Sequence, residues 1–437
     1  MINYFSHFQG KKITLMGLGL LGRGLGVARF LIEQDAQLTI TDLKTKRELT
    51  DSLKKLSKFK GVKYVLGQHR LADFENRDLI IKSAGVPFDS KYIKEAKKNK
   101  ISIEMDASLF AKLAPVKIIG ITGTRGKSTV TDIVYQILKK HYKKGDVFLG
   151  GNVKGIATLP LLKKVKEQDI VVMELDSWQM QGFGDSKISP HIAVFTNFLS
   201  DHMNYYRNSM NRYFDDKANI FKYQSKDDYL IISQQANQEI RKRFKSKIKS
   251  KIIKISDNKW ETKLLGQHNQ NNINLAVEVL KILGINKLVI KKELKTYLGM
   301  PGRLEFVRTF KEVDYYNDTN STTPDALMVA LNSFNKKVIL IAGGNDKELD
   351  YKEVVKVIRK KTKAIILIKG TATDKILKLI ECPVEVVESM KKAVGKANQF
   401  AQKGDIVLLS PGATSFGVFK NEYDRGDQFR ELVNKYV

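Results

Sequence analysis

The sequence predicts an α/β protein with mainly parallel sheets, divided into three domains. Short β-branched runs alternate with amphipathic helical segments along the whole chain, which is typical of βαβ units. Two glycine-containing turns each follow a buried strand and open a helix, one at residues 17–22 and one at residues 123–126. The 437 residues are enough for more than one such unit.

The first predicted domain opens with a strand at 12–17, a GxGxxG turn and a helix to about Ile32. Asp42 ends the next strand, and this arrangement is typical of the dinucleotide-binding, Rossmann-like fold. Alone, it indicates NAD(P) or FAD with Asp42 at the ribose. It also fits the diphosphate of a UDP-sugar, with Asp42 or Lys44 near the uridine, or only a tight turn with close helix packing.

The second glycine turn has the composition of a phosphate-binding loop. Small residues let backbone N–H groups surround phosphate oxygens, Lys127 reaches the outer phosphates, and the Ser128 hydroxyl can hold Mg²⁺. Ile121 stands where the full Walker pattern has its first Gly, so a chance Gly-Lys-Ser in a strand–turn–helix connection is the alternative. The predicted triphosphate-binding residues are Gly123, Thr124, Gly126, Lys127, Ser128 and Thr129.

Polar residues follow the next two buried strands of this predicted domain. Glu174 ends the strand at 169–174, and His202 lies shortly after the strand at 192–197. Ligands bind at the carboxyl ends of parallel strands, so both side chains are candidates to complete a Mg²⁺ shell with Ser128. Lys217, on a predicted helix from Asn208 to about Tyr223, is by pattern alone one more helical lysine.

The third predicted domain follows a predicted boundary at Gly299–Gly302 and contains predicted strands at 313–317, 338–342, 364–368 and 405–409. Leu113-Ala114-Pro115 marks the earlier break, which gives predicted domains of 1–114, 115–300 and 301–437. A helix begins near Asn269, whose amide either binds nucleotide or caps the helix. Arg303 and Asp318 are candidates for phosphate and ribose contacts.

Composition narrows the class of protein. The net charge of +29 comes from lysines and arginines scattered along the chain and not interleaved with aromatics, which favours solvated faces over nucleic-acid binding. Cys382, the single cysteine, excludes an internal disulfide and a cysteine-cluster zinc site, and we interpret it as structural. No membrane-spanning run and no secretion signal are present, so a cytoplasmic protein is expected.

In this order, the motifs resemble the Mur ligase family, the ATP-dependent amide-forming enzymes of peptidoglycan precursor synthesis. The resemblance covers essentially the whole chain. Its motifs are the loop at 123–129, Gly150-Gly151-Asn152, residues 174–178, 196–202 and 268–272, Gly302-Arg303, Asn317-Asp318, residues 343–347, 408–416 and 425–429. The motifs of the third domain are similar to those of the member that adds D-glutamate.

The resemblance implies a reaction and a set of site residues. The expected substrates are ATP, UDP-N-acetylmuramoyl-L-alanine and D-glutamate, joined through an acyl phosphate by a monomer with no nucleic-acid or membrane partner. Lys127, His202 and Lys217 are the expected catalytic residues. Two Mg²⁺ ions would be held by Ser128 with Glu174 and by His202 with a carbamylated Lys217. The other implied contacts are Asn269, Asn272, Arg303 and Asp318 for ATP; Leu20, Leu21, Asp42, Lys44, Gly85 and Asn152 for the UDP substrate; and Thr322, Lys347 and Ser415 for the amino acid.

This chain departs from the family pattern at several positions. Arg125 replaces the asparagine of the phosphate loop, and Asp176 replaces a serine. Asn320 stands where the family has a lysine near the amino-acid substrate, so addition of another amino acid such as L-glutamate is one alternative. The others are a folylpolyglutamate-type ligase, an NAD(P)-dependent oxidoreductase and a nucleic-acid-stimulated ATPase.

Overall fold

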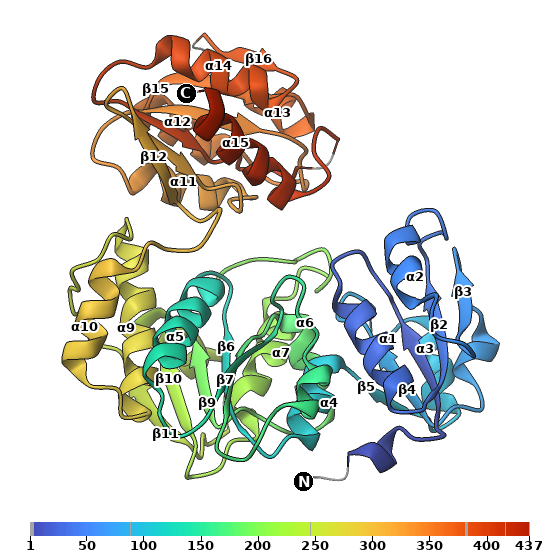
Figure 1. Ribbon diagram of the computed structural model, residues 1–437. Helices are drawn as coiled ribbons and strands as arrows, with labels where there is room; N and C mark the ends of the chain where they lie inside the picture. Colours follow the sequence, from blue (N-terminus) through green and yellow to red (C-terminus); the bar gives the residue numbers. More distant parts are fainter. Residues whose placement is uncertain (1–3, 88, 245, 381–382, 416, 437) are drawn as a thin grey trace. The chain divides into compact units, whose positions relative to one another are not determined.

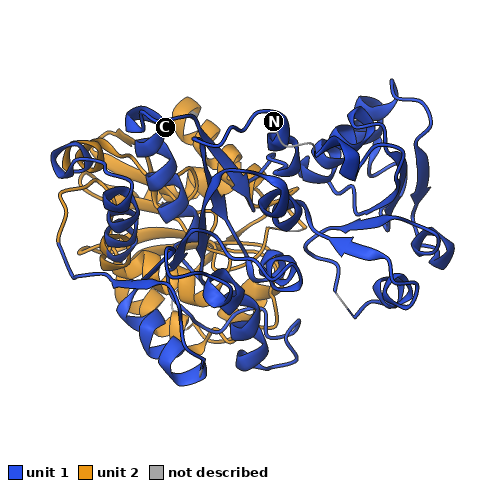
Figure 2. Ribbon diagram, turned by 90° about the horizontal axis from the view of Figure 1, so that it is seen from below, with its two compact units in different colours: residues 1–258, 271–290 blue, residues 259–270, 291–437 orange. Residues whose placement is uncertain are grey.

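The structure is a computed structural model of the chain, and it describes residues 4–87, 89–244, 246–380, 383–415 and 417–436 (Figure 1). Cys382, and Phe416 of the motif at 408–416, lie outside the described residues. The chain forms two compact units, which Figure 2 colours separately: unit 1 contains residues 1–258 and 271–290, and unit 2 contains residues 259–270 and 291–437. The described strands form three sheets, and the predicted α/β class is confirmed. The division into three domains stays a prediction.

The first sheet lies in unit 1, has the order β3-β2-β1-β4-β5 and is parallel. Its strands are β1 (Lys12–Met16), β2 (Gln37–Asp42), β3 (Lys63–Leu66), β4 (Leu79–Lys82) and β5 (Ser102–Glu104). The accompanying helices are η1 (Phe5–His7), α1 (Arg23–Glu33), α2 (Thr50–Leu56), η2 (Leu71–Phe74), α3 (Lys91–Lys98) and α4 (Asp106–Leu113). The glycine turn therefore joins the end of β1 to the start of α1.

The second sheet also lies in unit 1, with the order β11-β10-β9-β6-β8-β7. Its strands are β6 (Lys117–Thr122), β7 (Val147–Gly151), β8 (Ile170–Glu174), β9 (Ile192–Phe195), β10 (Tyr229–Ile232) and β11 (Lys251–Lys254). Its helices are α5 (Lys127–His141), η3 (Leu159–Lys163), α6 (Ser177–Asp185), α7 (Met210–Lys222) and α8 (Gln234–Arg243), and α9 (Gln267–Ile282) and α10 (Lys287–Thr296) follow along the chain. The phosphate loop connects central strand β6 to α5.

The third sheet lies in unit 2, with the order β12-β13-β17-β14-β15-β16. Its strands are β12 (Glu305–Phe310), β13 (Val313–Asn317), β14 (Val338–Gly343), β15 (Thr362–Ile368), β16 (Glu385–Val387) and β17 (Ile406–Leu409). Its helices are α11 (Pro324–Asn332), α12 (Lys352–Lys361), α13 (Thr371–Leu377), α14 (Met390–Phe400) and α15 (Glu422–Tyr436). Apart from β12, which pairs antiparallel with β13, the sheet is parallel.

One apolar core runs from the first sheet to the second within unit 1. It joins Phe30 of α1, Phe110 of α4 and Phe183 of α6, each at most 1% exposed. This continuity places the glycine turn and the phosphate loop in one compact unit with a shared core. In unit 2, two further cores cover the two faces of the third sheet. None of the helices within the described residues has the length and apolar character needed to cross a membrane.

The predicted strands at 37–42 and 313–317 have those bounds in the structure, and the helix predicted to end near Ile32 ends at Glu33. One alternative is wrong: α9 begins at Gln267, so Asn269 lies inside the first turn and is not the residue that caps the helix. Strands β3, β5, β7, β10, β11, β12 and β16 were not predicted.

Candidate active site

The phosphate loop has a backbone that only glycine adopts without strain at two positions. Gly123 has a φ of 140°, and a Cβ atom there would lie 1.9 Å from the Thr196 hydroxyl oxygen. Gly126, with a φ of 82°, is the N-cap residue before α5, and a Cβ atom on it would lie 2.2 Å from Oδ1 of Asn272. Asn272 therefore contacts the phosphate loop, and its role in binding ATP stays a prediction.

The segment that follows β9 holds this loop in place. Thr124 N donates to Asn197 O at 2.9 Å, and Arg125 N donates to the Asn197 side-chain oxygen at 2.9 Å. Arg125 O accepts from the Thr196 hydroxyl at 2.6 Å. Because these contacts fix the loop from one side, its N–H groups are preorganised for phosphate before a nucleotide binds.

Two lysine ammonium groups meet at the carbonyl of Gly123. Lys217 Nζ donates to it at 2.8 Å, and Lys127 Nζ donates to it at 3.1 Å. Lys217 is 1% exposed, and its burial, together with the charge of Lys127, lowers its pKa well below the usual range. A lowered pKa increases the share of unprotonated, nucleophilic amine, which is the form that reacts with CO₂.

Glu174 lies beside the phosphate loop on the neighbouring strand. In the parallel pairing of β6 and β8 it is opposite Ile121, and across β7 it is opposite Gly151. Its carbonyl accepts from Asn152 N at 2.6 Å, and Gly151 approaches so closely that a Cβ atom would lie 2.1 Å from that oxygen. The turn at 150–152 is thereby attached to the strand end that carries Glu174.

Asp201 lies between His202 and Arg125, a residue that departs from the family pattern. Arg125 Nη1 donates to Asp201 Oδ2 at 2.7 Å, and the same oxygen lies 3.7 Å from His202 Nε2. Burial lowers the pKa of His202 despite the opposing effect of Asp201, so the imidazole is neutral at pH 7. A neutral imidazole is the form that binds a metal ion.

These donors suit Mg²⁺ rather than a metal held by protein alone. Within the described residues no three His, Cys, Asp or Glu side chains gather into a ready-made cluster. Mg²⁺ commonly takes one or two protein ligands and completes its shell with water and substrate phosphates. Glu174 beside the loop and the hydroxyl of Ser128 at the start of α5 match that pattern.

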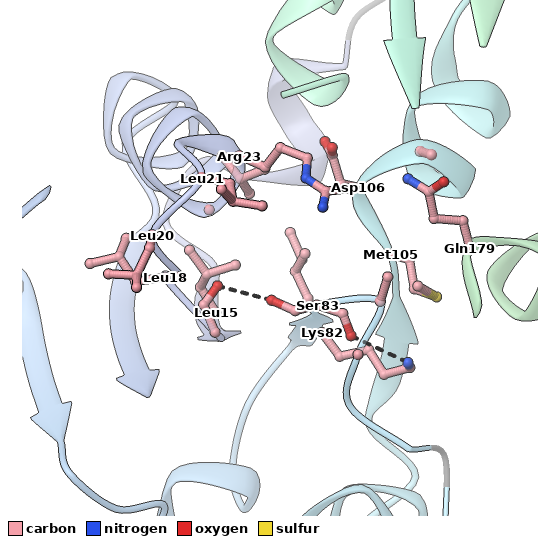
Figure 3. Close-up of a pocket in the computed structure, with 18 residues that line it drawn as sticks. Leu15, Leu18, Leu20, Leu21, Arg23, Lys82, Ser83, Met105, Asp106 and Gln179 are labelled. Atoms are coloured by element: carbon pink, nitrogen blue, oxygen red, sulfur yellow. Dashed lines mark hydrogen bonds between the residues drawn. The ribbon is translucent and has the colours of Figure 1, made fainter. Parts of the chain in front are cut away.

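A cavity of about 220 Å³ opens at the glycine turn, between the first and second sheets of unit 1 (Figure 3). Three of the residues predicted to bind the UDP substrate, Leu20, Leu21 and Gly85, line it. Leu20 and Leu21 are 61% and 44% exposed, so their side chains are accessible to a ligand in the cavity.

Two other residues of that predicted set have polar contacts that hold the turns. The Asp42 carboxylate accepts from the backbone N–H groups of Leu18, Gly19 and Lys44 at 2.8–2.9 Å. The Asn152 side-chain oxygen accepts from Arg23, which the sequence analysis did not single out. The Asp42 carboxylate therefore stabilises the conformation of the glycine turn.

In unit 2, Asp318 forms a buried hydrogen-bonded group at the end of β13. Its carboxylate accepts from Leu304 N at 3.0 Å, from the Ser410 hydroxyl at 2.9 Å and from the Ser321 hydroxyl. Burial outweighs these bonds and raises the pKa of Asp318 to about 6. Asn269, also in unit 2, donates its amide to Leu265 O at 2.7 Å.

Two residues predicted to bind the amino-acid substrate touch each other in unit 2: Lys347 Nζ lies 3.3 Å from the Thr322 hydroxyl. The third, Ser415, is buried in the connection after β17. Arg425 joins the two loops concerned, because its guanidinium donates to Thr319 O at 2.8 Å and to Ala413 O at 3.2 Å. Arg425 is completely buried, which the motif at 425–429 does not reveal, because arginines on helices are usually exposed.

Comparison with known proteins agrees with this arrangement. Three family models match the chain: the Mur ligase MurD-like N-terminal domain at residues 11–104, the Mur ligase middle domain at 121–261 and the Mur ligase glutamate ligase domain at 302–412. A UDP-N-acetylmuramoylalanine--D-glutamate ligase of Borreliella burgdorferi is 37% identical, over 97% of each chain. The protein of the same name from a Roseiflexus species is 33% identical, over 98% of this chain and 99% of the relative.

Solved structures share the fold. The UDP-N-acetylmuramate-alanine ligase MurC of Thermotoga maritima superposes with a TM-score of 0.61 at 17% identity, over 97% of this chain and 99% of the other. The MurF ligase of the same organism, solved in complex with ADP, gives a TM-score of 0.59 at 16% identity, over 100% and 98% of the two chains. The family models and the curated relatives define the class of protein, an ATP-dependent ligase, and the solved structures share its α/β fold. The chain belongs to the Mur ligase family.

We expect Gly123→Ala to destabilise the protein by about 2 kcal/mol or more, because its φ is strained for alanine and the Cβ atom meets Thr196. Gly395→Ala is the matched control, since Gly395 lies in α14 with nothing near the added atom. That change should leave stability equal or raise it by about 0.5–1 kcal/mol. Urea unfolding measures both, and equal effects of the two changes would contradict the loop geometry.

Asp318 makes stability depend on pH in a defined direction. Between the unfolded pKa near 4 and the folded pKa of about 6, the native state keeps a proton that the unfolded state has lost. The free energy of unfolding should therefore fall by up to about 3 kcal/mol as the pH rises through this window.

Asp318→Asn should remove that contribution, because the amide can accept from Leu304 and donate to the two hydroxyls. Urea unfolding of both proteins at pH 4, 5, 6 and 7 gives the difference in stability. Parallel curves would show that Asp318 titrates normally.

Proposed function

We propose that this protein is an ATP-dependent ligase that joins D-glutamate to UDP-N-acetylmuramoyl-L-alanine in peptidoglycan precursor synthesis. The observation that carries the proposal is a chain of contacts inside unit 1. Arg23 at the cavity donates to Asn152, Asn152 N donates to Glu174 O, and Glu174 lies opposite Ile121 just before the phosphate loop. A nucleotide-sugar site and a triphosphate site would thus be linked within one compact unit, as transfer between their ligands requires.

The reaction has two steps. A carboxylate oxygen of the UDP substrate attacks the γ-phosphorus of ATP, and the bond from that phosphorus to the β,γ-bridging oxygen breaks. The products are ADP and an acyl phosphate of the UDP substrate. The amine of D-glutamate then attacks the acyl carbon, a proton leaves the nitrogen, and inorganic phosphate departs from the tetrahedral intermediate. Both steps bring anions together, so the protein's task is to align them and offset their charge.

The residues of unit 1 suit that task. Lys127 and the loop N–H groups of Gly123, Thr124, Gly126, Ser128 and Thr129 would hold the phosphates. We propose that Ser128 and Glu174 hold one Mg²⁺ and that His202 and a carbamylated Lys217 hold a second. Bound Mg²⁺ would offset phosphate charge and polarise the γ-phosphoryl group. Asp201, paired with Arg125, would orient the imidazole of His202.

The remaining predicted contacts belong to the same proposal. Asn269, Asn272, Arg303 and Asp318 would bind ATP, and Thr322, Lys347 and Ser415 would bind the carboxylates of the amino acid. We assign residues 1–114, 115–300 and 301–437 to UDP-substrate, ATP and amino-acid domains. We further propose a monomer that works in the cytoplasm on these small molecules, without a nucleic-acid partner.

Lys217 should exist as a carbamate in the active protein. Its amine would attack CO₂ and lose a proton, which replaces a buried cation with an anionic oxygen ligand and removes the repulsion from Lys127. Protein equilibrated with ¹³C-bicarbonate should show one carbamate carbon signal by NMR, absent in Lys217→Arg. An unlabelled wild-type protein with full activity would contradict this role.

The choice of amino acid is tested with a panel of acidic and neutral amino acids, UDP-N-acetylmuramoyl-L-alanine and ATP. Phosphate release and product mass should show ligation of D-glutamate. Preference for L-glutamate or another amino acid would overturn the substrate assignment. The panel includes these amino acids because Asn320 replaces the lysine that the family has near the amino-acid substrate.

Lys127→Ala should lower turnover by about 100-fold or more, as expected when a preorganised cation at the reacting phosphate is lost. Binding of the UDP substrate, measured by calorimetry, should remain because Lys127 is not among the residues that line the cavity. Full turnover in this variant would contradict the phosphate-loop assignment.

A further inference from the structure

The glycine turn of the first sheet has already used part of its capacity to bind an anion. Leu18 N and Gly19 N donate to Oδ2 of Asp42 at 2.8 and 2.9 Å, and Asp42 is 5% exposed. In dinucleotide-binding folds the N–H groups of this turn face the diphosphate. Here two of them are occupied by a carboxylate, which also places a negative charge beside the turn. A diphosphate bound at this cavity therefore needs a positive partner from elsewhere.

Arg23 is placed to be that partner. It is the first residue of α1, directly after Gly22 of the turn, and it lines the cavity. Its Nη1 donates to the Asn152 side-chain oxygen at 2.7 Å. Among the described residues, this is the one hydrogen bond that the guanidinium makes. Figure 3 shows the side chain extending from α1 toward Asp106 at the edge of the cavity.

The other charged groups that line the cavity are engaged with backbone. Lys82 Nζ donates to Val86 O at 2.6 Å, and Lys82 is 1% exposed. The Asp106 carboxylate accepts from Thr158 N at 3.0 Å and from Leu159 N at 2.6 Å. Arg23 lines the same cavity with its Nη1 bonded to Asn152, and its charge also acts on the Asp106 carboxylate.

We propose that Arg23 binds the diphosphate of the nucleotide-sugar substrate; this inference rests on the proposed function. A guanidinium offers two parallel N–H donors to phosphate oxygens, and the bond to Asn152 fixes its orientation. The exposed Leu20 and Leu21 at the tip of the turn would make the apolar contacts with the uridine. Asn152 couples this diphosphate contact to the strand end that carries Glu174.

Arg23→Gln should weaken binding of UDP about 10- to 100-fold, the range expected when hydrogen bonds to a charged group are lost. Binding of uridine, which lacks phosphate, should be unchanged. Arg23→Lys should fall between, because it keeps the charge and loses the fork. Calorimetry measures UDP, and ligand-observed NMR measures uridine.

Arg29→Gln is the matched control. Arg29 lies on the same helix, pairs with Glu33 at 2.7 Å on the surface and does not line the cavity, so UDP affinity should stay at the wild-type value. In steady-state kinetics, Arg23→Gln should raise the KM for the UDP substrate and leave the KM for ATP unchanged.

Two results would overturn the inference: unchanged UDP affinity in Arg23→Gln, or an equal loss for UDP and uridine, which would assign Arg23 a purely structural role. A wild-type protein that binds no UDP would overturn the proposed function itself, and the inference with it. The wild-type titration therefore distinguishes the two failures.

Discussion

The backbone bracing of the phosphate loop is the constraint on which the rest of the site depends. Thr196 and Asn197, which follow β9, hold the main chain of Thr124 and Arg125 through short hydrogen bonds. Gly123 fits between them because it has no side chain. An unbraced loop would have to order itself when nucleotide binds, at a cost in conformational entropy. The parallel sheet supplies this bracing because the carboxyl ends of β6, β8 and β9 lie together.

Charge around the loop follows from this geometry. Lys127 and Lys217 both donate to the carbonyl of Gly123, and burial makes the ammonium form of Lys217 costly. A phosphate group near the two lysines would offset their positive charge, and a carbamate on Lys217 would replace one of the two cations with an anion. Charges of opposite sign also lie at the glycine turn of the first sheet. The Asp42 carboxylate accepts from the turn, and Arg23 directly after the turn carries the positive charge.

The sequence predicted the parts of the fold that have local signals. Buried β-branched strands such as 37–42 and the glycine turns were found because hydrophobic runs and φ-positive positions are local properties. Strand β12 was missed because its hairpin turns at Lys311 and Glu312, both with positive φ, where glycine or asparagine would be the usual signal. For the site, motif order found the phosphate loop and Glu174. The contacts Arg125–Asp201 and Arg23–Asn152 join residues 76 and 129 positions apart, and no local pattern reports them.

In the proposed reaction, the phosphate loop activates a carboxylate as an acyl phosphate. Oxygen transfer shows whether this happens: the reaction is run with UDP-N-acetylmuramoyl-L-alanine labelled with ¹⁸O in both carboxylate oxygens, ATP and D-glutamate. One labelled oxygen should appear in each inorganic phosphate released, because the carboxylate oxygen that attacks the γ-phosphorus leaves with it. Phosphate without label, measured by mass spectrometry in reactions that form the amide, would contradict the account.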